Sequence, residues 1–192
     1  MIKLAIFASG SGTNAENIIT SFKSHPSISV SLVLSNKPDA YVITRAKRHC
    51  IPFYIFNKEQ LNDPYSIYDI LNENGIDYII LAGFLLKIPE RMVKKYSDRI
   101  INIHPALLPK YGGKGMYGMN VHKAVVNAGE KETGITIHIV DEKYDNGKIL
   151  FQAKCDVTSS DTPDTVAGKI HQLEQENFPK IIEDYIIGET HK

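Results

Sequence analysis

Two polar side chains lie two residues apart at the end of a short apolar run. Asn102 and His104 alternate with isoleucines in IINIHP, which covers residues 100–105. In an extended strand such side chains point to the same side, so we expect the amide and the imidazole to face one cavity. Pro105 favours an extended residue before it, so the strand should end at His104. This pair could stabilise developing charge and transfer a proton, but a core histidine bonded to backbone would give the same pattern.

Asp145 is the carboxylate that could complete such a site. It directly precedes Asn146-Gly147, a pair typical of chain reversals, so residues 134–140 and 149–156 are predicted to be antiparallel strands. Asp145 itself has two interpretations. It could stabilise the turn through its own backbone, as aspartates in such turns often do, or it could relay protons for a reaction nearby.

A glycine-rich loop follows the first apolar strand, residues 3–7. The loop reads ASGSGTN over residues 8–14 and leads into a helical pattern. Backbone N–H groups at such a helix start favour an anion, so a phosphate site is predicted, although a tight turn alone would also need glycine. The pattern Gly10-x-Gly12 also matches a dinucleotide fingerprint. The second strand, residues 28–34, is followed by Ser-Asn-Lys without the carboxylate that binds a ribose, which disfavours dinucleotide binding.

Strands and helices alternate along the chain, which predicts an α/β fold with a mostly parallel twisted sheet flanked by helices and an antiparallel strand pair near the C-terminal end. Further strands are predicted over residues 52–56, 78–81 and 100–104. Helices are predicted over residues 39–48, 64–74 and 121–128, with one ending at residue 96 and a last one from about residue 162 that stops before Pro179.

Two connecting segments could border a site. Residues 82–89 form an apolar loop that is either plain core or a wall for a flat heterocycle. Residues 105–120 are rich in glycine and long for a connection inside a domain, as active-site lids often are.

The composition is that of an ordinary globular protein. The 192 residues fit a single domain spanning 1–192, and 22 basic residues balance 22 acidic ones, which disfavours nucleic acid as the main ligand. The two cysteines are far apart and lack a metal-ligand spacing, so we expect reduced thiols, no bound metal and a cytoplasmic protein. No stretch has the pattern of a signal peptide or a membrane span, so no membrane contact is expected.

Three stretches together resemble the phosphoribosylglycinamide formyltransferases, a folate-dependent family. They are FASGSGTN at residues 7–14, INIHPALLPKY at residues 101–111 and GITIHIVDEKYDNGKILFQ at residues 134–152. The resemblance covers nearly the whole chain in order and spacing, and it implies a Rossmann-like formyltransferase fold.

The resemblance also implies an activity and a set of site residues. The reaction is transfer of a formyl group from the co-substrate 10-formyltetrahydrofolate to the amine of glycinamide ribonucleotide in purine biosynthesis. Apart from the resemblance, we expect either a monomer or a homodimer. The implied catalytic residues are Asn102, His104 and Asp145, with His138 supporting them. The implied binding residues are Gly12, Thr13 and Asn14 for the substrate phosphate, Glu174 for the amine, and Leu85, Leu86, Lys87, Ile88, Asn102, Val140, Asp141 and Asp145 for the folate.

Two alternatives from the same group of enzymes share the Asn-x-His and Asp elements. A methionyl-tRNA formyltransferase would be expected to carry a further basic domain, and a formyltetrahydrofolate hydrolase a further regulatory domain. Neither fits in 192 charge-balanced residues. A folate- or nucleotide-binding module without catalytic activity is a third possibility, which the intact Asn102, His104 and Asp145 disfavour.

Overall fold

The first strand, β1 (Ile2–Phe7), pairs with parallel neighbours on both sides. In the computed structural model, which describes residues 1–190, these neighbours are β2 (Ile28–Ser35) and β4 (Tyr78–Leu81), and β2 also pairs with β3 (Phe53–Ile55). The strand order in this part of the chain is therefore β3-β2-β1-β4. Residues 4–7 are fully buried, as expected for a parallel strand that is covered on both faces.

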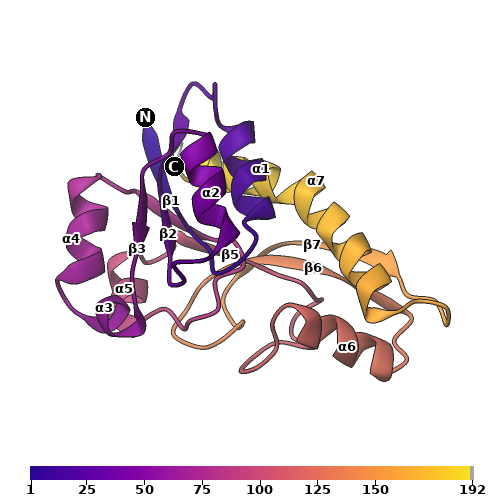
Figure 1. Ribbon diagram of the computed structural model, residues 1–192. Coiled ribbons are helices and arrows are strands. Elements are labelled where there is room, and N and C mark those ends of the chain that lie inside the picture. Colours follow the sequence, from indigo (N-terminus) through magenta and orange to yellow (C-terminus); the bar gives the residue numbers. More distant parts are fainter. Residues whose placement is uncertain (191–192) are drawn as a thin grey trace. The chain divides into compact units, whose positions relative to one another are not determined.

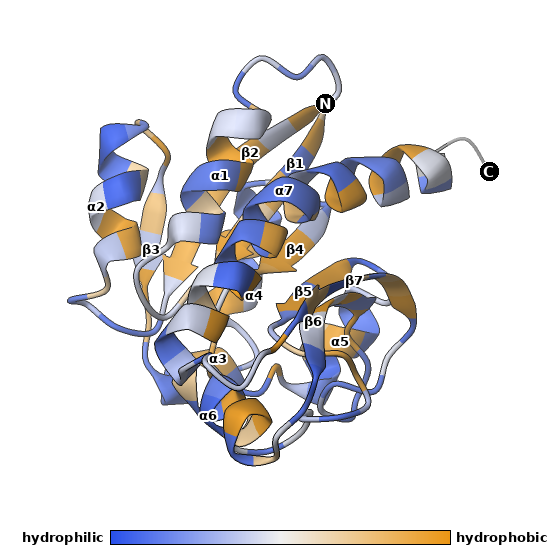
Figure 2. Ribbon diagram, turned by 90° about the vertical axis from the view of Figure 1, so that its right-hand side faces the viewer, coloured by the Kyte–Doolittle hydropathy of each residue, from blue (hydrophilic) through white to orange (hydrophobic). Residues whose placement is uncertain are grey.

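The chain forms two compact units, Met1–Ile101 and Asn102–Lys192. In the first unit the helices are α1 (Thr13–Ser21), α2 (Tyr41–Arg48), α3 (Lys58–Asn62), α4 (Ser66–Glu73) and α5 (Glu90–Lys95). Figure 1 shows α1 and α2 on one face of the strands and α4 on the opposite face. Figure 2 shows hydrophobic colours in these strands and both hydrophilic and hydrophobic stretches along α2. The helices therefore bury apolar stripes against the sheet.

The loops at the carboxyl ends of β1, β2 and β4 are tied together by Ser9. The backbone N–H of Ser9 donates to the carbonyl of Gly83 at 3.1 Å, and its hydroxyl donates to Asn36 Oδ1 at 2.6 Å. The same hydroxyl accepts from the Leu85 N–H at 3.0 Å. Because carboxyl ends of parallel strands meet at one edge, this edge of the first unit gathers the glycine-rich loop and the apolar loop.

Strand β5 (Ile100–His104) begins in the first unit and ends in the second. In the second unit β6 (Glu132–Ile139) pairs antiparallel with β7 (Ile149–Asp156), as the sequence predicted. The two strands approach closely at Gly134, where a Cβ would lie 1.9 Å from the Ala153 carbonyl oxygen. Helices α6 (Met119–Asn127) and α7 (Pro163–Thr190) complete the unit, and α7 contacts both β6 and β7.

The last helix is longer than the sequence predicted. The expected end before Pro179 is wrong, because α7 continues to Thr190. Proline removes one helical hydrogen bond, but Phe178, Ile182 and Ile186 are fully buried and follow one another at four-residue intervals. Burial of this continuous apolar face on both sides of Pro179 outweighs the lost bond. A second difference is α3, a short helix that begins with a capping box at Asn57, in a segment for which no helix was predicted.

Over residues 1–190, no helix has the length and apolar character that crossing a membrane would require.

Candidate active site

His104 ends β5 with its imidazole buried and its two ring nitrogens facing different partners. Nε2 lies 2.8 Å from the carbonyl oxygen of Tyr111. Because a carbonyl oxygen can only accept, Nε2 carries a proton and donates it. Nδ1 lies 3.7 Å from Oδ2 of Asp145. That distance is too long for a direct hydrogen bond, and the two groups attract each other as an ion pair only when His104 carries a proton on both ring nitrogens.

Asp145 lies in the loop between β6 and β7 and does not organise the turn there. Its carboxylate Oδ2 accepts the backbone N–H of Gly113 at 2.8 Å, so the side chain points away from its own turn. The turn is organised by Asp141, which accepts the Lys143 N–H at 2.8 Å and the Asn146 amide at 2.9 Å. Asp145 has a positive φ of 49°, a conformation that aspartate tolerates better than most residues. Of its two interpretations, the geometry favours proton relay over stabilisation of the turn.

His138 connects Asn102 with Asp145. Its Nδ1 lies 2.9 Å from the Ile139 carbonyl oxygen and therefore carries the proton, so Nε2 accepts from Asn102 Nδ2 at 3.0 Å. Burial lowers the pKa of His138 below its ordinary value and outweighs the hydrogen bond to Ile139 and the charge of Asp145, which raise it, so the ring is neutral at pH 7. The same Nε2 lies 3.8 Å from Asp145 Oδ1. Asp145 therefore has one histidine beside each of its oxygens.

These four side chains form a compact polar cluster within the second unit. Asn102 keeps one amide N–H for a ligand, since His138 accepts only one of the two. His104 Nδ1 and Asp145 Oδ2 face each other, and the neutral His138 fixes the Asn102 amide by accepting from it. An arrangement of an amide donor, an imidazole and a carboxylate is suited to acyl transfer, in which an oxyanion forms and a proton is moved.

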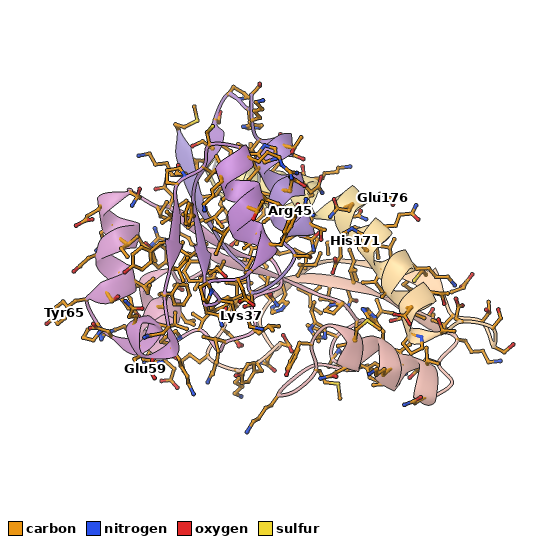
Figure 3. The ribbon with its side chains drawn as sticks, in the orientation of Figure 1. Lys37, Arg45, Glu59, Tyr65, His171 and Glu176 are labelled. Carbon is orange, nitrogen blue, oxygen red and sulfur yellow. The ribbon has the colours of Figure 1, made fainter. Side chains whose placement is uncertain are left out.

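The glycine-rich loop of the first unit is shaped by α2. Gly12 has a positive φ of 74° and is the N-cap of α1, without a side-chain hydrogen bond to the helix start. A Cβ at Gly12 would lie 2.5 Å from Val42 Cβ. The Val42 N–H donates to the Gly10 carbonyl at 3.1 Å, and Nε of Arg45, labelled on α2 in Figure 3, donates to the Ser11 carbonyl at 2.9 Å. The first-turn N–H groups of α1 thus lie at the end of a loop that hydrogen bonds to α2 hold in place, as an anion site requires.

The chain matches the family model described as formyl transferase over residues 2–182. The chain belongs to the formyl transferase family. It is 35% identical to phosphoribosylglycinamide formyltransferase of Bacillus subtilis, covering 97% of this chain and 95% of that protein. It is 39% identical to the chloroplastic enzyme of Arabidopsis thaliana over 94% of this chain, and it spans 64% of that relative's length. The crystal structure of the Bacillus halodurans phosphoribosylglycinamide formyltransferase superimposes with a TM-score of 0.84 at 36% identity, covering 93% of this chain and 92% of that one.

The structural match confirms the predicted fold class. The chain has the Rossmann-like formyltransferase fold, with a mostly parallel sheet flanked by helices and the antiparallel pair β6-β7 near the C-terminal end.

The remaining residues that the resemblance assigns to binding are divided between the two units. In the first unit Leu85 and Lys87 are exposed, Leu86 is half-buried and Ile88 is buried in the core. In the second unit Val140 and Asp141 are half-buried. Gly12, Thr13 and Asn14 belong to the first unit, whereas the catalytic candidates and Glu174 belong to the second.

Glu174 lies on α7 with a mostly buried side chain. One carboxylate oxygen is 3.8 Å from Nδ1 of His171, which Figure 3 labels on the same helix. The assignment of Glu174 to amine binding, like the other binding assignments, stays a prediction.

The backbone groups that hold the cluster could not be recognised from the sequence. The Tyr111 carbonyl and the Gly113 N–H bind His104 and Asp145, and neither is visible as a side-chain type. The segment that carries them is fastened to the strands: Thr136 donates to the Ala106 carbonyl at 2.7 Å and accepts from the Leu108 N–H at 3.0 Å. The glycine pair after Tyr111 was the available signal, because backbone that approaches other groups closely often needs glycine.

Within residues 1–190, no group of three or more histidine, cysteine, aspartate or glutamate side chains is arranged to hold a metal ion.

Proposed function

We propose that this formyl transferase moves the formyl group of 10-formyltetrahydrofolate to the amine of glycinamide ribonucleotide, giving formylglycinamide ribonucleotide and tetrahydrofolate. The reaction would belong to de novo purine biosynthesis. The observation that carries the proposal is the convergence of Asn102, His104 and Asp145 around one point of the second unit. The relatives that match over nearly their whole length bear the name of this activity.

In the first step the substrate amine attacks the formyl carbon, and a C–N bond forms while the carbonyl oxygen becomes an oxyanion. The amide N–H of Asn102 that His138 leaves unused would donate to this oxyanion. Protonated His104 could donate from Nδ1, because Nε2 is held by the Tyr111 carbonyl. Such preorganised donors lower the barrier because they are aimed where the charge develops.

In the second step the proton released by the attacking amine reaches the folate nitrogen, and the bond between that nitrogen and the formyl carbon breaks. Asp145 would accept the amine proton directly or through a water molecule, and a water molecule would also have to carry it between Asp145 and His104, whose facing atoms are 3.7 Å apart. His138 stays neutral and holds the Asn102 amide in place. Its role is to orient a donor and not to carry charge.

We assign substrate binding to the residues that the family resemblance implies. Gly12, Thr13 and Asn14 would bind the ribonucleotide phosphate through the start of α1, and Glu174 would bind its amine. The folate would contact Leu85, Leu86, Lys87, Ile88, Asn102, Val140, Asp141 and Asp145. Of these, Ile88 would act through packing, since its side chain is buried.

The proposal includes the working form of the protein. We infer a single formyltransferase domain over residues 1–192 that acts in the cytoplasm as a monomer or homodimer on small molecules, without nucleic acid or membrane partners. Sedimentation equilibrium with and without both substrates would distinguish monomer from dimer, and a larger assembly would contradict this part of the proposal.

A steady-state assay of the purified chain tests the activity. Loss of the 10-formyl donor is followed with and without glycinamide ribonucleotide. We expect donor loss that depends on the ribonucleotide. Donor loss without it would indicate a hydrolase, and no loss in either mixture would contradict the proposed reaction.

A further inference from the structure

The carbonyl that accepts the hydrogen bond of His104 belongs to a residue in an unfavourable backbone conformation. Tyr111 has a φ of 55°, in the left-handed region that side chains other than glycine rarely adopt. Its carbonyl oxygen accepts from His104 Nε2 at 2.8 Å. The direction of this carbonyl, and with it the orientation of the imidazole, depends on the surroundings holding Tyr111 in that conformation.

Glu130 binds the Tyr111 side chain at its far end. The Tyr111 hydroxyl donates to Glu130 Oε1 at 2.9 Å, and the ring packs against a buried cluster that includes Ala106, Val121 and Val125. The ammonium of Lys110 donates to both carboxylate oxygens of Glu130, at 2.9 and 3.2 Å. These bonds hold the pKa of Glu130 below its ordinary value, so it is ionised at neutral pH and accepts strongly.

Glu130 is itself fixed at the end of α6. Its backbone N–H donates to the Val125 carbonyl at 3.3 Å, immediately after Gly129, which has a positive φ. The carboxylate therefore projects from a defined turn and binds Lys110 and Tyr111, the second of which accepts the hydrogen bond of His104. A continuous chain of contacts leads from the end of α6 through Tyr111 to the imidazole.

We propose that Glu130 and the Tyr111 side chain are positioning residues, which hold the Tyr111 carbonyl in place so that His104 Nδ1 faces Asp145. This inference rests on the proposed formyl transfer and adds residues that touch no substrate atom. Without the Glu130 bond, Tyr111 is free to leave its strained conformation, and its carbonyl turns away from Nε2. The imidazole can then rotate, and Nδ1 no longer stays 3.7 Å from Asp145 Oδ2.

The proposal predicts a loss of turnover without a loss of binding. Tyr111→Phe keeps the packed ring and removes only the hydroxyl, and Glu130→Ala removes its acceptor. We expect kcat to fall about tenfold in each variant, short of the roughly hundredfold that a misplacement of 1 Å can cause, with both KM values unchanged. Glu130→Gln should recover most of the activity, because its amide oxygen can still accept from the Tyr111 hydroxyl.

Two variants serve as matched controls. Tyr65→Phe removes the hydroxyl of an exposed tyrosine in the first unit. Glu132→Gln breaks the exposed pair in which Lys154 Nζ donates to Glu132 Oε1 at 2.8 Å. Both should keep the kcat of the unmodified chain.

A second readout does not depend on activity. In protein labelled with ¹⁵N at histidine, the Nε2 proton of His104 should be protected from exchange with solvent, and Tyr111→Phe or Glu130→Ala should remove this protection. Unchanged exchange together with unchanged kcat would overturn the positioning role. If the unmodified chain shows no formyl transfer but the exchange still responds to these variants, the proposed function fails and the positioning role remains.

Discussion

Substitution of Gly12 by alanine tests how the glycine-rich loop is built. The added Cβ would lie 2.5 Å from both Cβ and Cγ2 of Val42 and 2.8 Å from its Cα, closer than real Cβ atoms approach. Because a backbone atom is among the three, a side-chain rotation of Val42 cannot relieve the clash. The constraint on Gly12 therefore comes from α2, whatever ligand the loop binds.

The cost of Gly12→Ala has two parts. Placing a side chain on a residue with a φ of 74° costs about 1–2 kcal/mol, and forcing it into a packed region costs about 1–3 kcal/mol. The sum of about 2–5 kcal/mol corresponds to a fall in Tm of roughly 4–20 °C for a chain of this size. If the loop binds the substrate phosphate, the KM for glycinamide ribonucleotide should rise as well, because the loop must move away from α2.

Gly10→Ala is the matched control. A Cβ at Gly10 meets no atom within 4 Å, so we expect its Tm to stay near that of the unmodified chain. Both variants can be compared by thermal unfolding followed by circular dichroism, with KM measured on the same preparations. Equal Tm values for the two variants would refute the argument from close approach.

Three further predictions concern the cluster and the start of α7. Asn102→Ala should lower kcat by about 10²–10³-fold, as loss of one oxyanion donor does, with an unchanged circular dichroism spectrum. His138 should titrate at a lower pH than an ordinary histidine in a ¹⁵N titration, because burial lowers its pKa. The unfolded chain therefore binds a proton that the folded chain excludes, so the free energy of unfolding should fall as the pH drops below about 6.5. This fall should be smaller in His138→Gln. The pKa of Asp161 is held well below its ordinary value by hydrogen bonds from Lys169, Thr158 and Thr165, so Asp161→Asn should reduce stability at pH 7. Denaturant unfolding should show that the difference in stability between the variant and the unmodified chain shrinks as the pH falls below about 4.

The sequence could predict the catalytic candidates because their signals are local. Strand alternation places Asn102 and His104 on one side, Pro105 ends the strand, and the Asn-Gly pair marks the reversal beside Asp145. The turn itself is organised by Asp141, which the sequence could not separate from Asp145, since both are aspartates in one short loop.

Other features depend on contacts between distant segments. The Tyr111 carbonyl and the Gly113 N–H reach His104 and Asp145 only after the chain has folded, and backbone groups carry no residue type to recognise. The continuation of α7 past Pro179 follows from burial of its apolar face, which local proline chemistry does not reveal.

The central claim is that Asn102, His104 and Asp145 act together in formyl transfer. Rapid-quench measurement of formylglycinamide ribonucleotide in single turnovers tests it most directly, with the unmodified chain, Asn102→Ala, Asp145→Asn and the double variant. We predict that the unmodified chain forms the product, that each substitution removes most of the rate, and that the double variant is little slower than the slower single one, because groups that act as a unit are not additive. Absence of product from the unmodified chain, or rate losses that multiply as if the residues were independent, would contradict the account.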